Sequence, residues 1–303
     1  MLRPRDVLPG EGGGGDVSSA AQALDSSAFG RVRDLPALRF VRRHVLSVYA
    51  ALALGYLFLP IVIVVLFSFN NPKGRFNYTW EGFTFKNWEN PFGYPGLGGA
   101  LRVSIEIALL SSFFATLLGT LVALALVRYR FRGSATTNLL IFIPMTTPEV
   151  VMGASLLTLF VNWRIPQGFG TILIAHILFN VSYVVVTVRA RLVGFDRHLE
   201  EAAMDLGANE AMTFLKVTLP LIMPGILAAG LLAFALSIDD FVITYFNAGA
   251  TVTFPLFVWG AARVATPPQI NVIGTAIFII AVTGMLGTIV LQNYRSRKGA
   301  FAL

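Results

Sequence analysis

Four carboxylic acids lie inside long apolar stretches of this sequence, where charged residues are otherwise scarce: Glu106, Glu149, Asp239 and Asp240. A charge at the centre of a bilayer costs at least about 2.5–3.5 kcal/mol, so residues of this kind are first candidates for function. Carboxylates at that depth could stabilise a small cation that has lost part of its hydration. The chemistry they indicate is the binding and passage of a cation, with no bond made or broken.

Aromatic rings beside the paired aspartates would strengthen such a site. Phe241 follows Asp240 directly, and Tyr245 lies one helical turn further on. The faces of both rings could make cation–π contacts with an ammonium group. Adjacent residues of a helix point about 100° apart, so Asp239 and Asp240 cannot both face one pathway. We expect Asp240 to face it, while one of the two caps a helix or pairs with a neighbouring one.

The other polar residues of the apolar stretches also have structural interpretations. Glu106 lies one helical turn from Arg102 and is expected to pair with it. Glu149 could serve helix packing around nearby prolines instead of binding a cation. His176 and Asn180, one turn apart, are more typical of hydrogen bonds between helices than of ligands.

The elements that position these residues must lie in lipid. Of the 303 residues, 55% are hydrophobic and 13% charged, whereas soluble domains carry about 25% charged residues. The absence of cysteine excludes thiol nucleophiles and thiolate metal sites, and three scattered histidines disfavour a zinc site. The net charge of +7 comes from short clusters between apolar runs. A nucleic-acid site would instead show a basic stripe with interleaved aromatics, so that class is excluded.

The apolar runs are long enough to cross a bilayer, which takes about 20 residues. They cover residues 45–69, 101–127, 138–161, 171–193, 223–247 and 269–292. In hydrocarbon only helices and closed barrels satisfy their own backbone, and continuous apolar runs are not the alternating strands of a barrel. The sequence therefore predicts an all-α polytopic membrane protein with six transmembrane helices.

The rise of about 1.5 Å per residue places the acids along these helices. Glu149 would lie about 16 Å from the inner end of the third helix, near the midplane of the bilayer. Asp239 and Asp240 would lie about 25 Å from the inner end of the fifth helix. Pro144 and Pro148 remove backbone donors just before Glu149, so we expect the third helix to be broken there.

Basic residues set the expected orientation. With both termini in the cytoplasm, 17 of the 23 Lys and Arg residues fall inside and six outside, as the positive-inside rule requires. Residues 1–40, whose first 30 are rich in Gly, Ser and Ala, are then expected to form a disordered basic cytoplasmic tail. Residues 41–295 would form the transmembrane domain, and residues 296–303 a short cytoplasmic tail.

One cytoplasmic connection, residues 194–222, is predicted to have structure of its own. Asp196 is placed to cap a short helix, and Glu201 lies early in it, where the helix dipole favours negative charge. Gly207 would end this helix after about three turns. A second short helix is expected to follow and to run until Pro220.

The residues of this connection resemble a known motif. It reads Glu201-Ala202-Ala203, three residues, Gly207, nine residues, then Val217-x-Leu219-Pro220. This pattern is similar to the EAA loop of bacterial ABC-importer permeases, with Val217 where isoleucine is usual. The resemblance implies a coupling helix that docks in a cleft of an ATP-binding subunit, with small side chains allowing close approach and Glu201 facing a basic group. An amphipathic surface helix without a partner is the alternative.

The resemblance also implies the partners. The chain has no G-x-x-x-x-G-K-[ST] phosphate loop, so ATP and Mg²⁺ would be bound by a separate dimer of ATP-binding subunits. No cofactor, metal or catalytic residue is expected in this chain. A second permease subunit would complete the pathway, and an extracytoplasmic substrate-binding protein would deliver the cargo. The expected location is the bacterial cytoplasmic (inner) membrane.

Four further stretches resemble the permeases of spermidine/putrescine importers. They are RYRFRG (128–133), PEVVMGASLL (148–157), VVVTVRARLVGFD (184–196) and LSIDDFVITYF (236–246). This likeness, which extends over residues 45–295, implies import of a polyamine by alternating access. Asp240, Asp239, Glu149 and Tyr245 are the residues expected to line the substrate pathway. Another small solute in the same architecture, or an ATP-independent channel or secondary transporter, remains as an alternative.

Overall fold

The computed structural model describes residues 36–129 and 131–299 of the chain. The chain divides into two compact units, Met1–Val64 and Val65–Leu303, which are described separately. The predicted tail over 1–40 lies outside the described residues except for its last five positions, which are helical. Of the predicted tail over 296–303, only residues 296–299 are described, and they continue the last helix.

The first unit contributes one long helix, α2 (Pro36–Ser68), whose last turn belongs to the second unit. Residues His44–Ser68 form a 25-residue apolar span with a mean hydropathy of 2.7. Nearly every side chain from His44 to Val64 is exposed, as expected for a helix that is surrounded by lipid or by another chain. This helix corresponds to the first predicted transmembrane segment.

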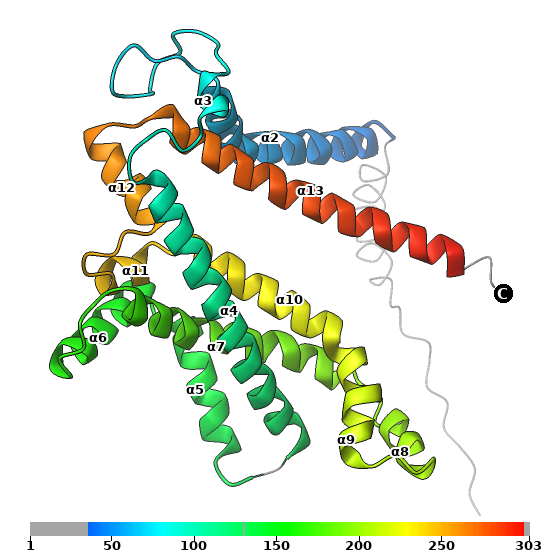
Figure 1. The fold of residues 1–303 in the computed structure, drawn as a ribbon. Coiled ribbons are helices and arrows are strands. Elements are labelled where there is room, and N and C mark those ends of the chain that lie inside the picture. Colours follow the sequence, from blue (N-terminus) through cyan, green and yellow to red (C-terminus); the bar gives the residue numbers. More distant parts are fainter. Residues whose placement is uncertain (1–35, 130, 300–303) are drawn as a thin grey trace, which may run out of the picture. The chain divides into compact units, whose positions relative to one another are not determined.

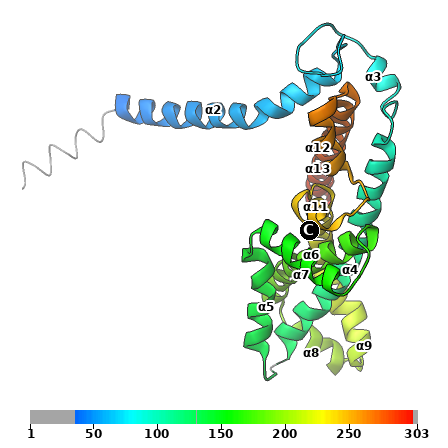
Figure 2. The ribbon, with the colours of Figure 1, turned by 90° about the vertical axis from the view of Figure 1, so that its left-hand side faces the viewer.

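In its described residues, the second unit is built from helices and loops (Figure 1 and Figure 2). Its long helices are α4 (Leu97–Arg128), α7 (Phe169–Val193), α10 (Leu219–Ile238) and α13 (Pro268–Gly299). The shorter ones are α3 (Lys86–Glu89), α5 (Ser134–Thr146), α6 (Glu149–Asn162), α8 (His198–Asp205), α9 (Glu210–Thr213), the π-helical turn η1 (Phe214–Thr218), α11 (Val242–Asn247) and α12 (Phe254–Val264). The predicted all-α class is confirmed for the part of the chain that the structure describes.

Helices α4, α7 and α10 pack against one another and form the core of this unit. Small residues let them approach closely. A methyl group on Gly119 of α4 would lie 2.6 Å from Cγ1 of Val184 on α7, and one on Gly230 of α10 would lie 3.1 Å from Oγ1 of Thr116 on α4. Lipid provides no hydrophobic drive between helices, so this van der Waals packing of small residues is what holds them together.

The third predicted helix, 138–161, is two helices, as its prolines predicted. The axes of α5 and α6 differ by 108°. Thr147 is extended, which is the conformation that a following proline imposes, and Pro148 has no N–H to continue the ladder of α5. If this bent pair counts as one span, six apolar segments of the described chain can cross a membrane, five of them as single helices.

The fifth predicted helix, 223–247, is wrong at both ends. The backbone is helical over Glu210–Ile238, and this segment includes Pro220 and Pro224. The π turn η1 comes directly before α10, and Pro220 lies in the first turn of α10. Backbone hydrogen bonds already deviate from the i to i−4 pattern in a π turn, so the absence of an N–H on Pro220 is tolerated there. The predicted second short helix therefore does not end at Pro220. The regular helix stops at Asp239 instead, and α11 begins three residues later.

Helix α12 is apolar and was not predicted from the sequence. It has 11 residues, which is too short to cross a bilayer. One of its faces packs with Leu97 of α4 and with Ile270 and Ile273 of α13. Figure 1 and Figure 2 show α12 and α3 at one end of the second unit and α8 at the other.

The segment before α4 is tied together by asparagine side chains. Nδ2 of Asn70 donates to Oδ1 of Asn77 at 2.6 Å and to the Thr79 carbonyl at 2.7 Å. Nδ2 of Asn87 donates to the carbonyls of Asn70, at 2.7 Å, and Ser68, at 3.1 Å. These bonds give the loop a defined surface at the α3 end of the unit.

The contact at Gly119 leads to a stability prediction. Gly119→Ala should lower the Tm of the protein in detergent, because the added methyl group overpacks the α4–α7 interface, at a cost of about 1–3 kcal/mol. Gly99→Ala is the matched control, since it lies on the same helix with no atom within 4 Å of its added methyl group. Thermal unfolding followed by size-exclusion chromatography measures both. Equal Tm values for the two variants would contradict the packing described above.

Candidate functional site

The carboxylate of Asp240 lies in the break between α10 and α11 and caps the start of α11. Its Oδ2 accepts hydrogen bonds from the backbone N–H of Thr244 at 2.8 Å and from the Thr244 hydroxyl at 2.8 Å. Its Oδ1 accepts from the backbone N–H of Ile243 at 3.3 Å. The first N–H groups of a helix have no partner within the helix. Asp240 therefore supplies the acceptors for the start of α11, directly after the span that ends at Ile238.

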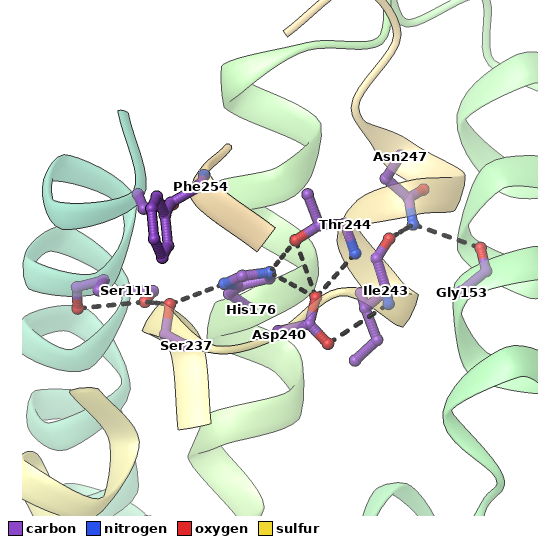
Figure 3. Close-up of polar contacts among 11 residues, drawn as sticks. Ser111, Gly153, His176, Ser237, Asp240, Ile243, Thr244, Asn247 and Phe254 are labelled. Atoms are coloured by element: carbon purple, nitrogen blue, oxygen red, sulfur yellow. Dashed lines mark hydrogen bonds and ion pairs between the residues drawn. The ribbon is translucent and has the colours of Figure 1, made fainter. Parts of the chain in front are cut away.

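A histidine on a neighbouring helix holds this carboxylate. Nε2 of His176 on α7 lies 3.2 Å from Oδ2 of Asp240 and 2.9 Å from Oγ1 of Thr244. Nδ1 of His176 lies 2.7 Å from the hydroxyl of Ser237 on α10, which in turn accepts from Ser111 on α4 at 2.9 Å. Figure 3 shows these five side chains, here called the break cluster, converging from four segments. A carboxylate only accepts hydrogen bonds, so Nε2 of His176 carries the proton that faces Asp240.

The break cluster is buried. The side chains of His176 and Asp240 are 3% and 5% exposed. Asp240 is therefore enclosed within this chain, and Asp239 is the exposed member of the pair. The prediction that one of the two aspartates caps a helix or pairs with a neighbouring one is confirmed by Asp240, which accepts from the first turn of α11 and contacts His176 on α7. The 100° offset itself does not apply, because α10 ends at Ile238. Which of them meets a cargo stays a prediction.

Helix α11 is also fixed to α6. Nδ2 of Asn247 donates to the carbonyl of Gly153 at 3.3 Å and to that of Ile243 at 2.8 Å (Figure 3). A methyl group on Gly153 would lie 2.8 Å from Cδ2 of Phe246, so only glycine allows this approach. The bent pair α5–α6 thus contacts the segment after α10 through α6 and α11.

The remaining predicted residues lie as follows. Nε of Arg102 donates to Oε1 of Glu106 at 2.7 Å, which confirms that pair. Glu149 is exposed in the first turn of α6, directly after the bend. Tyr245 is half exposed. The prediction for Asn180 is wrong here, because its amide is fully buried and has no hydrogen-bond partner among the described residues.

The connection at the other end of the unit forms two short helices. Oδ1 of Asp196 accepts from the backbone N–H of His198 at 3.0 Å, where α8 begins. Glu201 lies in the first turn of α8, and Gly207 follows its end with φ +90°, a conformation that favours glycine. Oδ1 of Asn209 accepts from the N–H of Met212 at 2.8 Å and so caps α9. The helix start, its early acid and its glycine stop agree with the sequence analysis.

Glu200 fastens α8 to the rest of the unit. Its carboxylate accepts hydrogen bonds from the guanidinium of Arg128, at the end of α4, and from the hydroxyl of Thr218 in η1. Nη2 of Arg197 donates to the carbonyl of Val127 at 3.0 Å. The sequence analysis assigned no contact to Glu200 or Arg128. These two residues lie 72 positions apart in the sequence, so the spacing of residues could not predict their contact.

The outer surface of this connection is apolar and unpartnered within the described chain. No residue of α8 is buried. Leu206 is 90% exposed, and Leu199 and Met204 are about half exposed. Glu201 is also exposed and lies 3.2 Å from Nδ1 of His198. Exposed apolar side chains gathered around a charge are typical of a protein interaction surface.

The break cluster leads to a second stability prediction. His176→Leu should lower the Tm strongly, because it leaves the buried carboxylate of Asp240 without its imidazole partner, and a buried polar group that loses its hydrogen-bond partner costs about 1–3 kcal/mol, or more when it is charged. Adding Asp240→Asn in the same chain should recover part of this loss, since a neutral amide is cheaper to bury than an unpaired carboxylate.

The exposed pair of Arg102 and Glu106 provides the control. Glu106→Gln should leave the Tm unchanged, because exposed ion pairs contribute little. Thermal unfolding of the three variants measures these effects. A His176→Leu protein as stable as the Glu106→Gln protein would show that the buried pair is not needed.

Comparisons with known proteins identify the family. The family described as binding-protein-dependent transport system inner membrane component matches residues 115–298. The chain is 38% identical over 244 residues to the spermidine/putrescine transport system permease protein PotC of Escherichia coli K12, which covers 80% of this chain and 92% of that protein. It is also 38% identical over 268 residues to the putrescine transport system permease protein PotI of the same organism, covering 85% of this chain and 92% of that one.

Solved structures agree on the fold. A chain of a bacterial ABC transporter that imports the acidic polysaccharide alginate matches with a TM-score of 0.59 and 17% identity, over 86% of this chain and 98% of that chain. A second structure of the bacterial alginate transporter, in complex with a periplasmic protein bound to an alginate pentasaccharide, matches with a TM-score of 0.55 and 16% identity, over 86% and 96% of the two chains. The family match covers more than half of the chain, and the sequence relatives exceed 30% identity. The chain therefore belongs to the binding-protein-dependent transport system inner membrane components, the permeases of ABC importers.

Proposed function

We propose that this permease imports a polyamine, spermidine or putrescine, by alternating access in the bacterial inner membrane. The observation that carries this proposal is the 38% identity to PotC and PotI, both polyamine permeases by name, over most of the chain. An exposed carboxylate at a helix break, Asp239, supports the same cargo, because it offers negative charge at membrane depth.

In the proposed orientation the α8 end of the unit lies in the cytoplasm, together with both chain termini. The distribution of basic residues supports this, since most of the Lys and Arg residues fall on that side. The α3 end, with its folded loop of asparagines, would then face outward. A substrate-binding protein would deliver its cargo there.

The connection around α8 is proposed to be the coupling helix. Its residues Glu201, Ala202, Ala203 and Gly207, with Leu219 and Pro220 behind them, fit the EAA pattern, and its apolar side chains are exposed as a docking surface requires. A dimer of ATP-binding subunits, holding ATP and Mg²⁺, would drive the cycle from this side. Of the two adjacent glutamates, Glu200 is directed into the chain and Glu201 is exposed, so Glu201 is the one proposed to meet the partner.

Two carboxylates would meet the cargo. Asp239 and Glu149 are both exposed, and each lies next to a helix break of this chain. A second permease subunit would supply the facing wall. In the buried state seen here, Asp240 would act by shaping the break that presents Asp239. Import of another small solute, or ATP-independent conduction, remains as an alternative.

The coupling role can be tested by reversing one charge. Glu201→Lys should abolish co-purification of the ATP-binding subunit and ATP-dependent uptake, because a positive charge would meet the basic group of the partner. Glu89→Lys, an equally exposed change at the opposite end, should keep the ATP-binding subunit bound. Full assembly and uptake with Glu201→Lys would exclude this residue from coupling.

The cargo can be tested by uptake of labelled spermidine into proteoliposomes that contain the complete importer. Asp239→Asn should reduce uptake about tenfold or more, since one charge-assisted hydrogen bond is worth about 1.5–3 kcal/mol. Glu106→Gln is the matched control, because that carboxylate is already paired with Arg102. No uptake by the unmodified importer would remove the polyamine from the proposal. Uptake that continues without ATP would favour a channel or secondary transporter.

A further inference from the structure

Helix α12 has a second face, opposite the one packed on α4 and α13. Phe257, Val258 and Ala261 belong to the packed cluster. Trp259 and Arg263, one helical turn apart, belong to the other face and are both exposed. A short apolar helix that displays a tryptophan and an arginine together has a surface that packing alone does not explain.

Three aromatic rings meet at this face. The ring centroid of Trp259 lies 5.4 Å from that of Tyr245 and 5.6 Å from that of Phe241. The centroids of Phe241 and Tyr245 are 5.6 Å apart. Trp259 is 38% exposed and Tyr245 is 50% exposed, so part of the aromatic surface stays open. These rings, here called the aromatic triad, come from α11 and its N-cap and from α12.

A cation of the chain itself lies on the triad. Cζ of Arg263 is 3.8 Å from the ring centroid of Trp259, well within the range of about 6 Å for a cation–π contact. Arg263 has no ion pair with a carboxylate in the part of the chain that the structure describes. The guanidinium therefore occupies the position that another cation would take over the indole ring.

The triad also lies next to the helix break. Phe241 comes two residues after the exposed Asp239 and directly after Asp240, whose bonds to His176 and Thr244 fix the start of α11. The break cluster thus positions one ring of the triad.

We propose that the aromatic triad is a binding site for an organic ammonium group, and that Arg263 occupies this site until the cargo displaces it. The inference rests on the proposed import of a cation, and it names Trp259 and Arg263 as residues of that path. Arg263 acts as a tethered competitor. Its removal should therefore strengthen binding of an ammonium ion, whereas loss of a ring should weaken it.

The test uses the fluorescence of Trp259 in the full chain, assembled with its partner subunits in lipid nanodiscs. The emission of the same complex carrying Trp259→Phe is subtracted, so that the difference belongs to Trp259 alone. Tetramethylammonium chloride is the probe, because it binds aromatic faces without donating hydrogen bonds, and sodium chloride at equal ionic strength is the reference.

We expect tetramethylammonium to change the Trp259 emission in a saturable way. Arg263→Gln should lower the half-saturating concentration about three- to thirtyfold, the range that one cation–π contact supports. Arg263→Lys, which keeps a cation, should stay near the unmodified complex, and Tyr245→Leu should raise the concentration. Arg164→Gln removes an exposed arginine outside the triad and should change nothing.

Two results would overturn the site. One is a Trp259 emission that does not respond to the probe in either the unmodified or the Arg263→Gln complex. The other is an unchanged or raised half-saturating concentration in Arg263→Gln. Spermidine uptake by the same complexes separates the two proposals. Spermidine uptake without a Trp259 response to tetramethylammonium would reject the proposed ammonium site and keep the proposed polyamine cargo. A Trp259 response without spermidine uptake would reject the cargo and keep the ammonium site.

Discussion

A backbone group that leaves a helix inside a bilayer must find its partner within the protein, because lipid offers none. This permease meets that requirement at the break after α10 with side chains. Asp240 accepts from the first turn of α11, His176 binds Asp240, and Ser237 binds His176. Because these bonds come from separate helices, they also fix how α7, α10 and α11 pack. The position of α11 depends on this buried network together with the contact of Asn247 to Gly153 on α6.

Neighbouring acids take different roles at both ends of the unit. At the break, Asp240 is buried and bonded, while Asp239 is exposed. In the connection around α8, Glu200 binds Arg128 and Thr218 inside the chain, while Glu201 faces outward. In each pair one carboxylate supplies the hydrogen bonds that fix the local structure, and its neighbour is thereby held exposed in a defined place.

Continuous helical backbone links the two ends. The segment Glu210–Ile238 contacts Glu200 of α8 through Thr218 and contacts His176 of the break cluster through Ser237, next to its last residue. A displacement of α8 would reach the break along this segment if the helix moves as a rigid element.

The sequence by itself determined the helical membrane class, the bend before Glu149, the helix stop at Gly207 and the pair of Arg102 and Glu106. These features depend on composition or on residues within about a turn of each other, which spacing reveals. Only the tertiary structure decided that the fifth span ends at Asp239, that His176 binds Asp240, and that α12 brings Trp259 to the triad. Those outcomes depend on hydrogen bonds and ring contacts between helices that are distant in the sequence, and one amino-acid sequence gives no direct evidence of such contacts.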